Sequence, residues 1–382
     1  MQESAPPADS PLCVVDGELE RILRAPVIHG LDALRALAIL LVLVDHYQVT
    51  DHLFRTHPGL GALGVMIFFV LSGFLITGLL LREYDRTGTI SLINFYRRRA
   101  YRIFPAFYCC WILATLVDIA FHQFHWKGAA ASFFYMMDYA RALRFSDPAY
   151  SQMWISWSLA VEEKFYLLWP LLLLALLRKR TGVVRTVSLV ILGLWGYRAF
   201  LHLAASVGWG YMYCAFEMRA DALLTGCVLA LLVSDAKTRI ACSRLLRWQW
   251  LNLLPPLALA WAVLLPPANR ALYLLLWSLQ PPIIAVMLLQ AVYWGQQSWT
   301  LCRHKIVRVV ALLSYSLYLY HPLGSRIVYL LHIPHNGLAS AVLVPVLAVA
   351  SYRFVERPFM SMRDRSRRAK AHQLVPAASA GV

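Results

Sequence analysis

The chain has 382 residues, of which 60% are hydrophobic and only 15% are charged. This composition excludes an ordinary soluble globular protein and is typical of a polytopic membrane protein. The formal net charge is +16, and the basic residues lie between hydrophobic stretches rather than along one stripe. We therefore expect basic cytoplasmic loops beside anionic lipid, and no nucleic acid as a partner.

The first segment, residues 1–30, is polar and holds five acidic residues before any hydrophobic stretch. It does not resemble a cleavable signal peptide, and it predicts a cytoplasmic N-terminal tail. The seven cysteines fall mostly inside or at the ends of hydrophobic stretches, with no CxxC pair and no His/Cys spacing typical of a metal site. The sequence therefore predicts neither a disulfide framework nor a bound metal.

Hydrophobic stretches long enough to cross a bilayer, about 20 residues each, recur along the rest of the chain. They predict an all-α bundle of about ten transmembrane helices, at residues 31–49, 60–81, 104–122, 155–177, 184–203, 217–234, 249–266, 271–293, 307–331 and 337–355. Helices are expected rather than a β-barrel because each long apolar run can satisfy its own backbone polar groups. Residues 31–356 would form this membrane domain, followed by a basic tail at 357–382.

The orientation follows from the distribution of positive charge. With the N-terminus inside, the inner segments hold 26 lysines and arginines, whereas the outer loops hold five: Arg55, Lys127, Arg141, Arg144 and Arg270. This asymmetry predicts that both termini are cytoplasmic in a multi-pass protein of the cell (inner or plasma) membrane. No internal repeat is apparent, which argues against a transporter built from inverted repeats.

The first predicted span, LDALRALAILLVLVDHY at 31–47, contains ionisable residues that are costly in a bilayer. Arg35 and His46 are 11 residues apart, which on a helix places both side chains on one face, about 16 Å apart along the axis. The alternative is an interhelical hydrogen bond for His46 and an Arg35 that extends to the interface. The shared face favours a functional pair.

Two further segments carry candidate functional residues. FFVLSGFLITG at 68–78 contains Ser72 and Gly73, whose small side chains would also suit close helix packing. The loop expected at 95–105, FYRRRAYRIFP, spaces Arg99 and Arg102 so that both guanidinium groups would lie on one side of a helix. Guanidinium forks suit phosphates, although a positive loop that anchors the cytoplasmic side would have the same composition.

Acidic and imidazole side chains recur in two later spans. WSLAVEEKFYLLWP at 157–170 contains Glu162 and Glu163, and SYSLYLYHP at 314–322 contains His321. A Glu163–Lys164 pair at the outer interface and a histidine bonded to a neighbouring helix are the structural alternatives.

In chain order, these segments and the terminal FVERP at 354–358 resemble the membrane-bound acyltransferase family 3. Members of that family transfer acyl groups from acyl-CoA to hydroxyls of sugars, surface polysaccharides or macrolides. The resemblance covers residues 30–358, and the series of motifs in this order and spacing is specific. It implies a ten-helix acyltransferase core.

The resemblance also implies roles for individual residues. It places Arg35 and His46 in the active site as an Arg-x10-His pair, with Glu162 as the acidic residue of the WSL motif. The RxxR motif falls on Arg99 and Arg102, and the serine–glycine pair on the residues named above.

O-acyl transfer needs a base that takes the proton of the acceptor hydroxyl, and an imidazole titrating near neutrality suits that role. We expect His46 to be this base or a transient acyl carrier, with Glu162 and His321 lining the acceptor pocket. Arg99 and Arg102 would bind the phosphates of acyl-CoA, expected to be acetyl-CoA, with Arg35 at the entrance.

Two features depart from many relatives. The chain ends soon after the last predicted span, so we expect no appended extracytoplasmic hydrolase-like domain and an acceptor within reach of the membrane core. Asp45 precedes His46 where an apolar or aromatic residue is expected, but neighbouring residues on a helix point about 100° apart.

The predicted function is transfer of an acyl group to a sugar hydroxyl of a surface polysaccharide, a lipo-oligosaccharide or a related glycan. A macrolide or another small molecule is an alternative acceptor. A secondary transporter with buried ionisable residues, or a membrane scaffold without activity, would also fit the composition.

Overall fold

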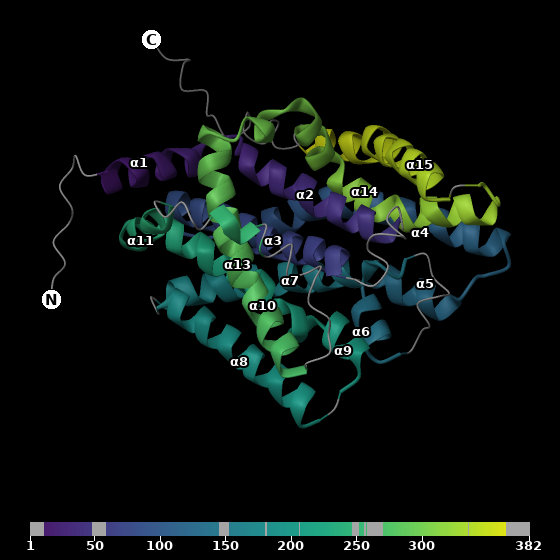
Figure 1. Ribbon diagram of the computed structural model, residues 1–382, viewed down its shortest axis with the longest axis horizontal. Coiled ribbons are helices and arrows are strands. Elements are labelled where there is room, and N and C mark those ends of the chain that lie inside the picture. Colours follow the sequence, from purple (N-terminus) through teal and green to yellow (C-terminus); the bar gives the residue numbers. More distant parts are fainter. Residues whose placement is uncertain are drawn as a thin grey trace, which may run out of the picture.

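The computed structural model in Figure 1 is a bundle of α-helices with no β-strand in the described part of the chain. The structure describes residues 11–47, 59–144, 153–179, 182–205, 207–246, 252–255, 257, 270–334 and 336–363. The predicted all-α class is confirmed for these residues.

The helices in chain order are α1 (Pro11–Arg24), α2 (His29–His46), α3 (Gly59–Thr87), α4 (Leu92–Ala120), α5 (Trp126–Phe133), α6 (Met137–Ala142), α7 (Ser156–Arg178), α8 (Val183–Leu203), α9 (Trp209–Cys214), α10 (Phe216–Ser234), α11 (Ala236–Leu246), α13 (Arg270–Gln297), α14 (Lys305–Leu330) and α15 (Asn336–Ser351). A π-helical turn, Tyr352–Glu356, continues α15, and the helix runs on to residue 363. The first residues of the predicted 357–382 tail are therefore helical.

The count of ten spans is not confirmed. Within the described residues, six helices are long and apolar enough to cross a membrane, or seven if α1 and α2, bent by 68°, count as one broken span. The predicted span at 249–266 lies almost wholly outside the described residues. Helices α2, α7 and α10 are 18, 23 and 19 residues long, but each carries three or more charged residues.

The basic segment at 95–105 is part of α4 rather than a loop, which corrects the prediction. Helix α4 starts at Leu92 and continues through Pro105. A proline within a membrane helix is tolerated where neighbouring groups satisfy the freed backbone carbonyl. Arg99 and Arg102 therefore lie three residues apart on a rigid helix.

Helix α3 is the central element, and its close contact with α10 depends on glycines. A Cβ atom on Gly73 would lie 1.9 Å from the carbonyl oxygen of Leu223 in α10. Conversely, a Cβ on Gly226 of α10 would lie 2.0 Å from the carbonyl oxygen of Val70 in α3. The two backbones therefore touch, as small residues allow between membrane helices.

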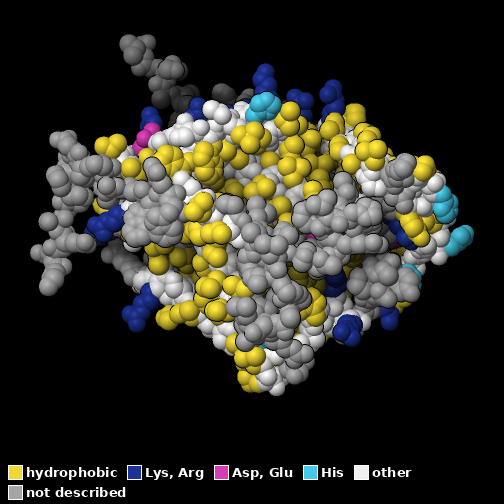
Figure 2. All heavy atoms as spheres, in the orientation of Figure 1, with side chains coloured by type: hydrophobic (Ala, Val, Ile, Leu, Met, Phe, Trp, Pro, Cys, Tyr) yellow, Lys and Arg dark blue, Asp and Glu magenta, His cyan; other side chains and the backbone are white. Residues whose placement is uncertain are grey.

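The two ends of the bundle are closed by short helices and ion pairs. At one end α1 packs on α11, where Arg239 bonds Asp16 and Glu20 at 3.0 and 2.6 Å. Toward the other end, Lys164 of α7 bonds Asp138 of α6 at 2.7 Å, so Lys164 pairs there rather than with Glu163. Figure 2 shows a largely hydrophobic face with Lys and Arg side chains gathered toward its edges.

Candidate active site

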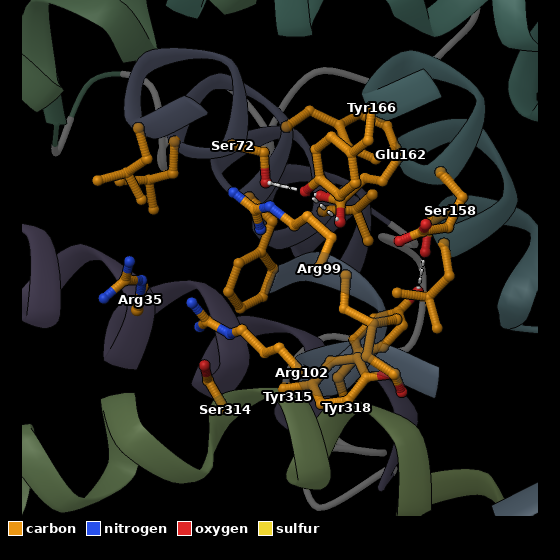
Figure 3. A pocket seen from close by; sticks show the side chains of 18 of the residues that line it. Arg35, Ser72, Arg99, Arg102, Ser158, Glu162, Tyr166, Ser314, Tyr315 and Tyr318 are labelled. Carbon is orange, nitrogen blue, oxygen red and sulfur yellow. Dashed lines mark hydrogen bonds between the residues drawn. The ribbon is translucent and has the colours of Figure 1, made fainter. Parts of the chain in front are cut away.

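A cavity of about 190 Å³ lies between α2, α3, α4, α7 and α14, inside the bundle. Its polar lining comes from all five helices, and Figure 3 labels most of these side chains. The polar and charged residues of the lining are Arg35, Ser72, Arg99, Arg102, Ser158, Glu162, Glu163, Tyr166, Ser314, Tyr315 and Tyr318. We call this space the central cavity.

Three arginines give the central cavity a positive wall. Figure 3 shows the guanidinium groups of Arg35, Arg99 and Arg102 directed into the same space. Arg35 bonds Asp32, one turn earlier in α2, at 3.2 Å. Among the described residues, neither Arg99 nor Arg102 has a carboxylate oxygen within salt-bridge distance, although both face a cavity inside the helical bundle.

A carboxylate is held opposite these arginines by two hydroxyl groups. Ser72 of α3 donates to Glu162 of α7 at 2.9 Å, and Tyr166, one turn further along α7, donates to the same carboxylate at 3.1 Å. The Tyr166 hydroxyl is also 3.1 Å from the Ser72 hydroxyl. The guanidinium of Arg99 lies over the Tyr166 ring, 4.7 Å from its centroid, which fixes the ring beside the positive wall.

Tyr318 of α14 lines the central cavity, and its hydroxyl lies 2.6 Å from the Ser158 hydroxyl of α7. Two histidines, His321 and His46, follow Tyr318 in a chain of ring contacts. The His321 ring is 5.6 Å from the Tyr318 ring and 4.8 Å from the His46 ring, which also contacts Trp154 at 5.5 Å. Tyr318 therefore lies between the cavity and the histidine pair.

The hydrogen bonds of the two histidines determine which ring nitrogen carries the hydrogen. His46 Nδ1 lies 2.7 Å from the carbonyl oxygen of Val42, and His321 Nδ1 lies 2.7 Å from that of Tyr318. Because a carbonyl oxygen only accepts, each Nδ1 must donate, and each neutral ring keeps its lone pair on Nε2. The Nε2 of His321 is buried and has no hydrogen-bond partner among the residues that the structure describes. Both imidazoles are thus held in the tautomer that can accept a proton at Nε2.

Most predicted site residues come together, but not all line the same space. Arg35, Ser72, Arg99, Arg102 and Glu162 line the central cavity. His46 and His321 contact each other outside that lining. His46 contacts His321 of α14, and Arg35 lines the central cavity together with Ser314 and Tyr315 of α14. Gly73 is absent from the lining and lies in the contact with α10, so its predicted role in donor binding stays a prediction.

Asp45, which precedes His46, has a hydrogen-bond partner in the neighbouring helix α3. Its carboxylate accepts a hydrogen bond from the backbone of Gly61, in the first turn of α3. Free backbone N–H groups at a helix start favour such a carboxylate. Asp45 therefore fastens the end of α2 to the start of α3.

Sequence reasoning missed Tyr166, Ser158 and Tyr318. Tyr166 follows Glu162 by four residues, and this helical spacing could have identified it as a partner for the carboxylate. The contact between Ser158 and Tyr318 joins helices 160 residues apart in sequence, and no local pattern predicts it.

The lining residues favour an anionic ligand rather than a metal ion. No group of three or more His, Cys, Asp or Glu side chains in the described ranges could hold a metal. Guanidinium, hydroxyl and phenol groups instead donate hydrogen bonds to phosphate or carboxylate oxygens.

A helical bundle with several membrane-crossing helices and a charged cavity between them defines an integral membrane protein with a buried polar site. The sequence model described as "Acyltransferase domain" matches residues 28–352. The chain therefore belongs to this acyltransferase family, and it is a multi-pass membrane protein.

Two curated O-acetyltransferases are similar to part of this chain. O-acetyltransferase OatA of Staphylococcus aureus is 35% identical over 222 residues, covering 56% of this chain and 36% of the relative. Peptidoglycan O-acetyltransferase OatA of Listeria monocytogenes is 34% identical over 215 residues, covering 53% of this chain and 33% of the relative. The chain thus spans about a third of the length of these relatives. No solved structure gives a significant match.

Proposed function

We propose that this membrane acyltransferase moves an acetyl group from cytoplasmic acetyl-CoA to a sugar hydroxyl of a surface glycan. The family and the names of the two OatA relatives support O-acetyl transfer, and the Listeria relative is named for peptidoglycan. A glycan acceptor fits these names better than a macrolide, and no contact in the described residues favours transport instead.

The assignment of the donor site rests on Arg99 and Arg102, which face the central cavity without a carboxylate partner among the described residues. An anionic ligand would supply the missing partner, and bidentate guanidinium contacts suit phosphate oxygens. We assign the diphosphate of the donor to this positive wall, with Arg35 as a third cation.

The second step of the proposal concerns the reacting groups. His46 ends α2 at 11 residues from Arg35, or about 16 Å along the helix axis. The pantetheine arm of a donor bound through its diphosphate would carry the thioester from the arginines toward the histidine pair. The phosphate site and the proton acceptor are therefore expected to be separate.

In the proposed reaction, Nε2 of His46 takes the proton of the acceptor hydroxyl as its oxygen attacks the thioester carbonyl carbon. The new C–O bond forms, the C–S bond breaks, and the CoA thiolate leaves and receives a proton from the imidazolium. His321 borders His46 with its own Nε2 lone pair and would stabilise the imidazolium. Glu162 accepts hydrogen bonds from Ser72 and Tyr166, and it would hold both hydroxyl groups beside the pantetheine arm of the donor.

Single substitutions of the two unpaired arginines test the donor site. Arg99→Ala or Arg102→Ala should raise KM for acetyl-CoA and leave KM for the acceptor nearly unchanged, because each removes contacts to donor phosphates. Lysine should rescue only partly, since it makes no bidentate contact. Arg97→Ala is the matched control, because Arg97 belongs to the same basic run but does not line the cavity. An unchanged donor KM in folded Arg99 and Arg102 variants would return both residues to a membrane-anchoring role.

A further inference from the structure

A second cavity, of about 170 Å³, adjoins the central cavity at the end of the bundle where α1 packs on α11. It lies between α1, α2, α3, α10 and α11. One wall is apolar and includes Phe74, Leu75 and Leu81. The charged residues of the lining are Glu20, Arg24, Arg82, Asp85 and Arg239. We call this space the end cavity.

The two cavities are neighbours. Leu75 of α3 lines both of them. On α2, Leu31 lines the end cavity and Arg35, one turn later, lines the central cavity. Along α3, the path runs from Gly78 in the end cavity past Leu75 to Ser72 in the central cavity, about 9 Å at 1.5 Å per residue.

Gly78 leaves space in the wall of the end cavity. A Cβ atom added to Gly78 would meet no atom within 4 Å, in contrast to Gly73 on the same helix. Gly78 is therefore not required for helix packing, and a larger side chain there would occupy the cavity rather than displace a helix.

The charges of the lining suit a phosphorylated nucleoside. Three arginines face two carboxylates, so the lining is net positive. Arg239 is already bonded to Asp16 and Glu20, and Arg24 to Glu20. Arg82 donates only to the carbonyl oxygen of Leu23, at 3.2 Å, and forms no ion pair in the part of the chain that the structure describes. Arg82 is thus the cation available to a phosphate, while the apolar wall suits a flat base.

We propose that the end cavity binds the adenosine 3′-phosphate end of the donor, with Arg82 contacting the 3′-phosphate. The inference rests on the proposed acyl-CoA donor. The order of sites along α3 then matches the covalent order of that donor: nucleoside in the end cavity, diphosphate at Arg99 and Arg102, and the arm directed toward His46. Glu20 and Asp85 offer acceptor oxygens for ribose hydroxyl or adenine amino groups.

The test compares ligands with and without the nucleoside. Binding of radiolabelled acetyl-CoA to purified protein in nanodiscs is measured directly. The affinity for unlabelled 4′-phosphopantetheine is measured by competition. Gly78→Phe should weaken acetyl-CoA binding about tenfold or more, the scale of a steric change in a binding pocket, and leave the affinity for 4′-phosphopantetheine unchanged. Gly193→Phe in α8 is the matched control, because a Cβ there also meets no atom within 4 Å and the site is exposed.

A second experiment tests the contact with the 3′-phosphate by comparing the affinities for CoA and 3′-dephospho-CoA. Wild-type protein should prefer CoA over 3′-dephospho-CoA, Arg82→Gln should lose that preference, and Arg86→Gln, one turn further and outside the lining, should keep it. Equal weakening of both ligands by Gly78→Phe, no weakening, or an unchanged preference in Arg82→Gln would overturn the assignment of the end cavity alone. Failure of wild-type protein to bind acetyl-CoA would overturn the proposed donor itself.

Discussion

The contact between His46 and His321 determines what each imidazole can do. Both Nδ1 atoms donate to carbonyl oxygens of their own helices, at 2.7 Å in each case. Both Nε2 atoms therefore hold lone pairs, and the rings are 4.8 Å apart. A free Nε2 lone pair is the acceptor that a base needs in order to take a proton from a hydroxyl.

Replacing His46 tests this role. His46→Ala should lower the transfer rate by about 10²- to 10⁴-fold, the range for loss of a general base. His46→Gln should be equally inactive, because an amide keeps the polarity but does not exchange a proton near neutrality. The measurement is initial rate at saturating donor, with protein amount and folding checked in the same membranes.

His29→Ala supplies the control for that comparison, because His29 begins α2 at the opposite end from His46. It should retain wild-type activity. Near-normal transfer by both His46 variants would leave the histidine pair with a structural role only.

At the residue scale, the sequence predicted the members of the site better than their arrangement. Arg35, Arg99, Arg102, Ser72 and Glu162 were predicted from separate segments, and they do line one cavity. The gap between that cavity and the histidines was not predictable, because it depends on the Tyr318 side chain. The position of Gly73 in the contact with α10 was also not predictable, because the local sequence does not reveal which helix this glycine faces.

At the element scale, charged residues explain most of the difference between predicted and observed spans. Hydropathy marks α2, α7 and α10 as spans, but several of their charged residues line the central cavity or pair with residues of other helices. In α10, for example, Asp221 forms a buried ion pair with Arg198 of α8 at 2.7 Å. The bend between α1 and α2 and the extension of α4 into the basic segment depend on packing, which periodicity does not reveal.

The contact between α3 and α10 gives a prediction for stability. Gly73→Ala places a methyl group where the Leu223 carbonyl lies, so it should destabilise the protein by about 1–3 kcal/mol, the usual cost of overpacking. Gly193→Ala should be neutral or stabilising by up to about 1 kcal/mol, since alanine favours a helix over glycine. Thermal unfolding in detergent measures both, and equal unfolding temperatures for the two variants would contradict the close contact.

At the scale of the whole molecule, the two cavities form a path from one end of the bundle toward its middle. The end with α1 and α11 is the predicted cytoplasmic end, where acyl-CoA is available. The charge asymmetry of the sequence predicts this orientation, and it stays a prediction. The all-helical class was predictable from composition, whereas the path was not, because it is formed by side chains from eight helices.

We propose that the protein transfers an acetyl group from acetyl-CoA to a sugar hydroxyl. The most direct measurement incubates purified protein with acetyl-CoA labelled in the acetyl group and glycan fragments of peptidoglycan. We expect label in the glycan as an ester that mild base releases, and no label with the Arg99→Ala/Arg102→Ala double variant. If folded wild-type protein forms no labelled ester, or if the double variant forms as much ester as the wild type, acetyl-CoA is not the donor bound by these arginines.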